Sequence, residues 1–288
     1  MDYHRPDTLT EALAIRADRD VVILAGGTDL YAEGAAREGW GEMRGSDVLD
    51  ITALAELRGI AEHADHWRIG ALTTWSDLIS APLPPLFDGC RQAAREIGGQ
   101  QVQNRGTLGG NICTASAAGD GAPNLLVLDA SVELASVHGR RVIPFAEFLA
   151  GYRRTRCRAE EIVTAIRVPK PGRAARAHFL KLGARRYLVI SIVMVAAAID
   201  TAPDGRIHAA RIAVGACSAV PQRLTALEAA LAGHRIVDAP ALVAPAHLQQ
   251  LAPIDDVRGS ADYRRHAALV LARDVLARLA PQVAEGGP

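Results

Sequence analysis

The first third of the chain alternates between short apolar runs and amphipathic stretches. The pattern predicts a helix at residues 8–17, a strand at 21–25, a helix at 29–38 and a strand at 47–51. Thr8 followed by Glu11 has the spacing of a helix N-cap with a capping box. A strand, a helix and a second strand within about 30 residues predict a small βαβ unit.

The middle of the chain has alternating patterns that are typical of strands and capped helices. The predicted elements are strands at 67–70, 131–137, 141–143 and 162–168 and helices at 74–80, 86–97 and 125–128. Between them lies a polar, Gly-rich stretch, Gln100–Ala122. Unstructured connections longer than about 12–15 residues are usually functional, so we expect a functional loop there.

The pattern starts again after Pro169 and Pro171, which mark the expected domain boundary. The predicted elements are strands at 178–182 and 207–215, a strand or helix at 188–199, a hairpin turn at 203–205 and helices at 226–232 and 263–279.

Composition narrows the classes of partner. With 288 residues, of which 49% are hydrophobic and 22% charged, the chain has the composition of a globular protein. It carries no net charge, so it has no net electrostatic field that would attract nucleic acid or an anionic membrane. Its longest apolar stretch, Tyr187–Ile199, is shorter than the roughly 20 residues that span a bilayer. No export signal opens the sequence, so we expect a cytoplasmic protein.

The chain shows no pattern of metal ligands or catalytic groups. Cys90, Cys113, Cys157 and Cys217 lie far apart without a CxxC motif, which argues against zinc or an iron–sulfur cluster carried by this chain alone. We expect buried, reduced thiols. No histidine or serine has a base and an orienting acid in a recognisable pattern, so we assign no catalytic residue and no metal site.

Two glycine segments carry the candidate chemistry. In the first, the apolar run ends at Gly26-Gly27 before a helix start, which leaves backbone N–H groups open to a phosphate because glycine has no Cβ. Thr28 adds a hydroxyl and Asp29 an acceptor. A plain tight turn is the alternative, since the segment matches neither GxGxxG nor the P-loop pattern.

The second segment runs from Gln103 to Thr114 and closes with Gly119-Asp120. Its glycines offer little bulk and its threonines and asparagine offer donors, which suits a pyrophosphate and a ribityl chain, while Asp120 is a candidate acceptor for sugar-like hydroxyls. A structural loop is the alternative. Together the two segments predict a nucleotide held between two subdomains.

Four segments, in order along nearly the whole chain, resemble a known family. They are AGGTDL at Ala25–Leu30, RGTLGGN at Arg105–Asn111, EEIVTAIRVP at Glu160–Pro169 and KLGARRYLVIS at Lys181–Ser191. The chain resembles the FAD-binding subunits of the molybdenum hydroxylase family, such as the xanthine dehydrogenase FAD subunit and the medium subunit of aerobic carbon monoxide dehydrogenase. It departs from that pattern at Val189-Ile190-Ser191, where relatives often read Asp-Ile-Ala.

The resemblance implies FAD as the cofactor and assigns its contacts. It makes Leu24–Leu30 the pyrophosphate turn and Gly106–Asn111 the second wall, and it puts Ile97 beside the adenine and Ile190 over the isoalloxazine. The implied cofactor-binding residues are Leu24, Ala25, Gly26, Gly27, Thr28, Asp29, Leu30, Ile97, Gly106, Thr107, Gly109, Gly110, Asn111, Thr114, Asp120, Val163, Lys181 and Ile190.

The implied fold is α+β, a two-subdomain FAD-binding domain of the PCMH type followed by a C-terminal α+β domain with a small antiparallel sheet and helices. The expected parts are a small βαβ FAD-binding subdomain at 1–57, a larger α+β FAD-binding subdomain at 58–171 and a C-terminal flavoprotein domain at 172–288. FAD would lie between the first two parts.

The implied function is electron transfer within a multi-subunit molybdopterin and iron–sulfur hydroxylase. The expected partners are a small subunit with two 2Fe-2S clusters and a molybdopterin large subunit, and the electrons would pass to NAD, oxygen or another acceptor. Two alternatives are a free-standing FAD oxidoreductase of related fold and a non-catalytic assembly subunit that has lost the flavin. Visible flavin absorbance, and reduction only with partner subunits, would distinguish the three.

Overall fold

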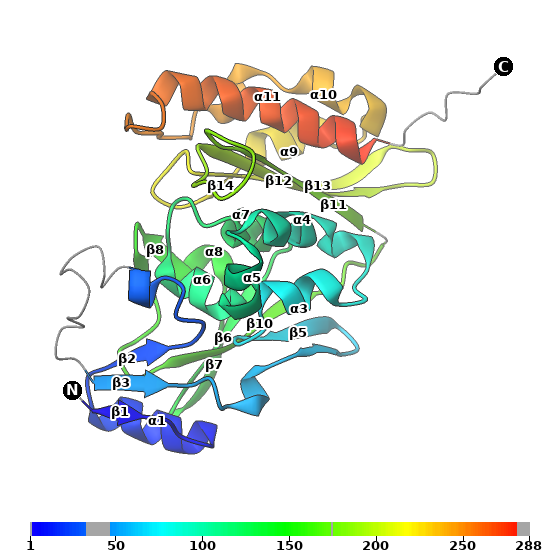
Figure 1. Ribbon diagram of the computed structural model, residues 1–288. Coiled ribbons are helices and arrows are strands. Elements are labelled where there is room, and N and C mark those ends of the chain that lie inside the picture. Colours follow the sequence, from blue (N-terminus) through cyan, green and yellow to red (C-terminus); the bar gives the residue numbers. More distant parts are fainter. Residues whose placement is uncertain (1, 33–46, 174, 281–288) are drawn as a thin grey trace. The chain divides into compact units, whose positions relative to one another are not determined.

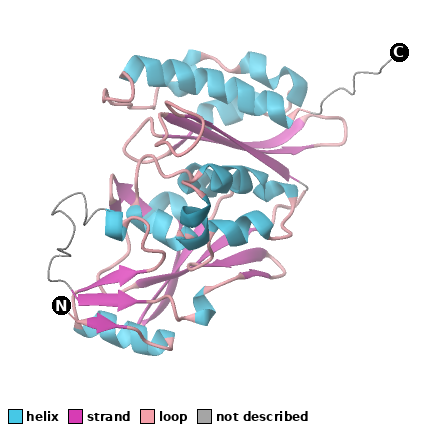
Figure 2. Cartoon of the chain, in the orientation of Figure 1, coloured by secondary structure: helices cyan, strands magenta, loops and turns pink. Residues whose placement is uncertain are grey.

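The computed structural model describes residues 2–32, 47–173 and 175–280, and it has the mixed helix and strand content that the sequence predicted (Figure 2). The chain forms two compact units that each combine separate stretches of sequence. Unit 1 comprises Met1–Ala81, Ile97–Ser116 and Asp129–Lys170, and unit 2 comprises Pro82–Glu96, Ala117–Leu128 and Pro171–Pro288.

Unit 1 begins with a small parallel sheet. Its strands, in the order β1-β3-β2, are β1 (Tyr3–His4), β2 (Val21–Leu24) and β3 (Asp47–Asp50), and helix α1 (Leu9–Asp18) connects the first two. The parallel pairing of β2 and β3 is the βαβ relation that the sequence predicted, whereas β1 was not predicted. Of the helix predicted at 29–38, residues 30–32 are helical and the remainder lies outside the described residues.

The capping box predicted at the start of α1 is only half formed. The hydroxyl of Thr8 accepts a hydrogen bond from the backbone N–H of Glu11 (3.2 Å), as predicted. The carboxylate of Glu11 accepts instead from the backbone N–H of Asp7 (3.3 Å), one residue before the cap.

The larger part of unit 1 is an antiparallel sheet in the order β4-β5-β10-β6-β7. Its strands are β4 (Ile60–Glu62), β5 (His66–Gly70), β6 (Ser131–Ser136), β7 (Gly139–Pro144) and β10 (Ile162–Pro169). Further elements are η1 (Ala55–Leu57), α3 (Trp75–Ser80), α8 (Phe145–Phe148) and a small hairpin of β8 (Leu149–Gly151) and β9 (Arg154–Thr155). Leu13 of α1 and Leu49 of β3 share one hydrophobic core with Leu72, Ala135 and Ile162, so burial of apolar surface joins the two sheets.

The long loop predicted at Gln100–Ala122 was wrong, because this segment contains helices. They are α5 (Gln100–Arg105), α6 (Leu108–Thr114) and the start of α7 (Gly121–Val127). Thr107 caps α6 through its hydroxyl, and Gly109 packs directly against Ala71. Capping and packing therefore override the low helix propensity of this glycine-rich sequence.

Unit 2 is built around an antiparallel sheet in the order β11-β12-β13-β14. The strands are β11 (Ala175–Leu182), β12 (Val193–Thr201), β13 (Ile207–Gly215) and β14 (Gln222–Arg223). The helical segments are η2 (Pro85–Phe87), α4 (Asp88–Glu96), α7, α9 (Thr225–Leu231), η3 (Ile236–Asp238), α10 (Ala239–Leu242), η4 (Pro245–Leu248) and α11 (Ala261–Leu279).

Helices cover both faces of the sheet in unit 2. Figure 1 shows α9, α10 and α11 on one face and α4 and α7 on the other. Every residue of β12 from Val193 to Asp200 is consequently buried, which explains why its sequence is a nearly continuous apolar run. The segment predicted as strand or helix at 188–199 is a strand that begins at Val193.

Sequence position alone does not separate the two units, because α4 and α7 come from the predicted range 58–171 yet pack in unit 2. The division into parts at 57/58 and 171/172 stays a prediction about subdomains. None of the helices in the described part of the chain has the length and apolar character needed to cross a membrane.

Candidate functional site

Strand β2 delivers the first glycine segment to the surface of unit 1. Its last residue, Leu24, is buried and its carbonyl accepts from the N–H of Ile51 (3.0 Å), which fixes the point where the chain leaves the sheet. Gly27 then takes a left-handed conformation with φ +75°, which glycine adopts without steric cost. In the described part of the chain, the backbone N–H groups from Gly26 to Asp29 donate to no other group. Four consecutive donors are thus available to a ligand.

The structure also shows why a glycine stands at two of the predicted positions. A Cβ on Gly26 would lie 2.1 Å from the carbonyl oxygen of Arg105, and a Cβ on Gly109 would lie 2.6 Å from the carbonyl oxygen of Ala71. These two glycines let backbone segments of unit 1 pack against each other. The close approach of Gly26 to Arg105 brings the two predicted glycine segments together.

The first turn of α6 has already used its backbone donors. The N–H of Leu108 donates to Thr73 O (2.9 Å), that of Gly109 to Ala71 O (2.9 Å) and that of Gly110 to Thr107 Oγ1 (3.1 Å). Leu108–Asn111 therefore lacks the free N–H groups that the first segment has.

Two other features of α6 remain open to a ligand. A Cβ on Gly110 would meet only Thr107 Oγ1, at 2.9 Å, so the chain itself does not fill that side of the glycine. The side-chain oxygen of Asn111 is buried and accepts no hydrogen bond within the part of the chain that the structure describes. A buried acceptor without a partner costs free energy, and a ligand hydroxyl would satisfy it.

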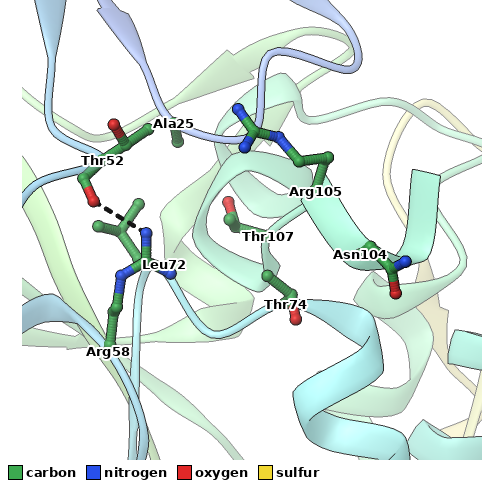
Figure 3. A pocket seen from close by; sticks show the side chains of 8 residues that line it. All are labelled: Ala25, Thr52, Arg58, Leu72, Thr74, Asn104, Arg105 and Thr107. Carbon is green, nitrogen blue, oxygen red and sulfur yellow. Dashed lines mark hydrogen bonds between the residues drawn. The ribbon is translucent and has the colours of Figure 1, made fainter. Parts of the chain in front are cut away.

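A pocket opens where the two glycine segments meet (Figure 3). Two of its lining residues were predicted from the sequence, Ala25 and Thr107. Asn104 and Arg105 belong to the second glycine segment but were not predicted as contacts, and four others were missed: Thr52, Arg58, Leu72 and Thr74. The pocket is smaller than the roughly 300–1,000 Å³ found for ligand pockets, so it suits one part of a nucleotide better than the whole.

Two guanidinium groups give this pocket its charge. Arg58 donates to the backbone oxygen of Thr52 (2.8 Å), as the dashed line in Figure 3 marks. Neither Arg58 nor Arg105 forms an ion pair with any described residue, so both keep their charge for a ligand. Guanidinium groups bind phosphate oxygens through charge-assisted hydrogen bonds. Arg105 opens the motif RGTLGGN, which was the available sequence signal for it.

Unit 2 contains a second polar cluster, built around Asp120 just before α7. The carboxylate is buried, at 5% exposure, and its Oδ2 accepts from Lys181 Nζ (2.6 Å), while its Oδ1 accepts from Ser191 Oγ (2.5 Å). Burial raises the pKa of Asp120, and Lys181 and Ser191 act in the opposite direction. Ser191 was not predicted as a site residue, since 71 positions separate it from Asp120.

The remaining predicted residues have different environments. In unit 1, Ile97 is half-buried ahead of α5, Val163 is buried in β10, and the hydroxyl of Thr114 donates to Gly110 O (3.0 Å). In unit 2, Ile190 is 64% exposed and directly precedes Ser191. Unit 1 thus collects the residues from Leu24 to Leu30, Ile97, 106–114 and Val163, and unit 2 collects Asp120, Lys181 and Ile190.

Among the described residues one group of side chains could geometrically hold a metal ion, namely Asp2, His4 and Asp47, whose ligand atoms lie within 4.8 Å of one another. Arg19 already pairs with Asp2 (3.2 Å) and Asp47 (3.5 Å), so a guanidinium supplies the compensating charge.

The cysteines only partly follow the prediction of buried thiols. All four are free, and Cys90 and Cys217 are buried, but Cys157 is half-buried and Cys113 is exposed on α6. The prediction was therefore wrong for Cys113, because sequence spacing does not tell which side of so short a helix faces the solvent.

Comparison with known proteins bears on both units. Residues 1–171 match the family described as "FAD binding domain in molybdopterin dehydrogenase", and residues 178–279 match "CO dehydrogenase flavoprotein C-terminal domain". The chain is 31% identical over 284 residues to the xanthine dehydrogenase FAD-binding subunit of Escherichia coli, an alignment that covers 95% of this chain and 94% of that protein. It is 35% identical over 199 residues to the nicotinate dehydrogenase FAD-subunit of Eubacterium barkeri, covering 67% of this chain and 66% of that protein.

A solved structure of carbon monoxide dehydrogenase from Hydrogenophaga pseudoflava contains a chain of the same fold. It superposes with a TM-score of 0.86 at 28% sequence identity, covering 97% of this chain and 96% of that chain.

Proposed function

The chain belongs to the family of FAD-binding domains in molybdopterin dehydrogenases, and we propose that it is the FAD-carrying electron-transfer subunit of a multi-subunit molybdenum hydroxylase. Family membership makes it an oxidoreductase component with FAD as its cofactor. The proposal adds the direction of electron flow, the partners and the residues that hold the cofactor.

The observation that carries the proposal is the row of free N–H groups from Gly26 to Asp29 beside two unpaired guanidinium groups. A pyrophosphate needs several hydrogen-bond donors and positive charge in one place, and this part of unit 1 supplies both. The unsatisfied oxygen of Asn111 adds an acceptor for a ligand hydroxyl. The residues present therefore fit the polar part of FAD.

We assign the predicted residues to the cofactor on this basis. In unit 1, Ala25–Asp29, Thr107 and Asn111 would hold the pyrophosphate and its neighbouring hydroxyls, with Arg58 and Arg105 adding charge. In unit 2, Asp120 and Lys181 would offer an acceptor and a donor to the cofactor, and Ile190 an exposed apolar contact. When bound, FAD supplies the ability to accept electrons and pass them on.

The partners follow from the chemistry that the chain lacks. Its cysteines are scattered and show no cluster-binding pattern, so we propose that electrons reach the flavin from a group on another chain. The relatives named as FAD-subunit and FAD-binding subunit support the same division of labour. We propose a small subunit with two 2Fe-2S clusters and a molybdopterin large subunit as partners, with NAD, oxygen or another molecule as the final acceptor.

The first experiment is a visible absorption spectrum of the purified chain, followed by chromatographic identification of the cofactor released by acid. Flavin bands with released FAD, and reduction by the organic substrate only when partner subunits are present, are the expected results. Reduction by substrate in the isolated chain would favour a free-standing oxidoreductase. A colourless chain that takes up no added FAD would favour an assembly subunit.

A further inference from the structure

The loop between β11 and β12 in unit 2 exposes apolar side chains at its tip. It leaves the sheet after Leu182 and returns at Ser191, and the N–H of Ile192 donates to Leu182 O (2.8 Å) where the two strands rejoin. Between these points Tyr187, Leu188 and Ile190 are each more than half exposed. Ile190 is the side chain proposed above as the flavin contact, and it immediately precedes Ser191.

One buried carboxylate connects the two ends of this loop. Asp120 accepts from Lys181 on the outgoing strand (2.6 Å) and from Ser191 on the returning segment (2.5 Å). Both oxygens are thus engaged, and each keeps one further lone pair for a ligand hydroxyl. Because Asp120 and Ser191 are both nearly or fully buried, this hydrogen bond has little competition from water.

The backbone around Ser191 is held from a second direction by two arginines. Arg258 donates to Ser191 O (3.3 Å), and Arg264, which is fully buried, donates to Ile192 O (2.6 Å). Asp256 pairs with both guanidinium groups at 2.6 Å and keeps them in place. Ser191 is consequently fixed through its backbone on one side and through its hydroxyl on the other.

We propose that Ser191 is a positioning residue for the flavin site: its hydroxyl aligns the carboxylate of Asp120 and sets the end of the loop that carries Ile190. The inference rests on the proposed function. In this role Ser191 acts through two other residues, Asp120 and Ile190. A side chain 71 residues from Asp120 in sequence thereby determines how the cofactor is seated.

The test compares Ser191→Ala with the matched variant Ser218→Ala in the full-length chain. The hydroxyl of Ser218 also hydrogen-bonds inside unit 2, but it donates to Cys217 O (2.5 Å) and accepts from the N–H of Ala252 (3.1 Å). Each protein is stripped of flavin and titrated with FAD, and the affinity and the visible spectrum of the bound cofactor are recorded. Loss of a hydrogen bond to a charged group changes an equilibrium constant by at least about tenfold. Ser191→Ala should therefore weaken the affinity for FAD by about that factor and shift the flavin absorption bands. Ser218→Ala should change neither.

A double-mutant cycle with Asp120→Asn shows whether Ser191 acts through Asp120. In that background, Ser191→Ala should weaken binding by much less than it does alone, because the shared interaction is already altered. Equal effects in both backgrounds would overturn the proposed route. If Ser191→Ala does not fold, Ser191→Cys preserves the side-chain size with a weak donor and should shift affinity and spectrum in the same direction.

The outcomes separate the two proposals. A wild-type chain that binds no FAD contradicts the proposed function. A wild-type chain that binds FAD while a folded Ser191 variant matches it in affinity and spectrum overturns only the inference about Ser191.

Discussion

The stability of unit 1 should depend on pH in part through the buried carboxylate of Glu133. Glu133 on β6 is 2% exposed, and its carboxylate accepts from Arg68 (3.0 Å), Thr164 (2.8 Å) and Arg167 (2.6 Å) across the sheet. Burial alone would raise the pKa of Glu133, but these hydrogen bonds outweigh it and lower the pKa from 4.5 to about 2.

The size and sign of the effect follow from this shift. A carboxyl group whose pKa is lowered by folding stabilises the protein fully at pH values above its pKa in the unfolded chain. For Glu133 that stabilisation is lost as the pH falls from 4.5 toward about 2. At about 1.4 kcal/mol per pKa unit, ionised Glu133 contributes about 3 kcal/mol at neutral pH, of which about 2 kcal/mol is lost by roughly pH 3. Glu133→Gln removes the ionisation and should lower the free energy of unfolding at neutral pH by a similar amount.

Tryptophan fluorescence during urea unfolding is the assay, because the three tryptophans, at positions 40, 67 and 75, all fall within the sequence range of unit 1. The stability difference between wild type and Glu133→Gln should shrink by about 2 kcal/mol between neutral pH and roughly pH 3. Glu147→Gln, at an exposed position of α8, is the matched control and should leave the free energy of unfolding at neutral pH unchanged. A difference that stays constant over this range would refute the reasoning.

Three further substitutions test the packing and the site. Gly110→Val should leave the circular dichroism spectrum largely unchanged but abolish retention of FAD, since an added Cβ meets only Thr107 Oγ1 within the chain. Stoichiometric FAD in the purified variant would contradict the placement of the cofactor. Gly26→Ala should destabilise unit 1 by about 1–3 kcal/mol, because its Cβ would lie 2.1 Å from a carbonyl oxygen, and unchanged urea unfolding would disprove that close contact. Asp120→Ala should lower the free energy of unfolding by about 3–5 kcal/mol, because it leaves the buried ammonium of Lys181 without a partner. A melting temperature equal to that of wild type would show that the pair contributes nothing to stability.

Local sequence patterns were reliable where a segment's structure depends on its own residues. The apolar run before Gly26-Gly27 predicted β2 and its turn, and Thr74 predicted the capped start of α3. The apolar run at 188–199 left strand and helix open, and the structure has a strand there from Val193. The resemblance of the four motifs to flavin subunits predicted the α+β fold and the cofactor, which the family match and the superposition confirm. The three-part division and the individual FAD contacts stay predictions.

Patterns failed where distant packing decides the structure. Gln100–Ala122 looks like a loop because its glycines have low helix propensity, yet it forms helices once Gly109 packs against Ala71. Membership of α4 and α7 in unit 2 likewise has no local signal, because it arises from burial against β11, β12 and β13.

The sequence by itself indicated many of the elements, because periodicity and capping are properties of neighbouring residues, and its resemblance to flavin subunits indicated the family and the kind of cofactor. Only the tertiary structure decided which donors stay free: the amides of α6 are used by Thr73, Ala71 and Thr107, whereas those from Gly26 to Asp29 are not. It also decided that Asp120 meets Lys181 and Ser191, since a hydrogen bond requires closeness in space and these residues are 61 and 71 positions away along the chain.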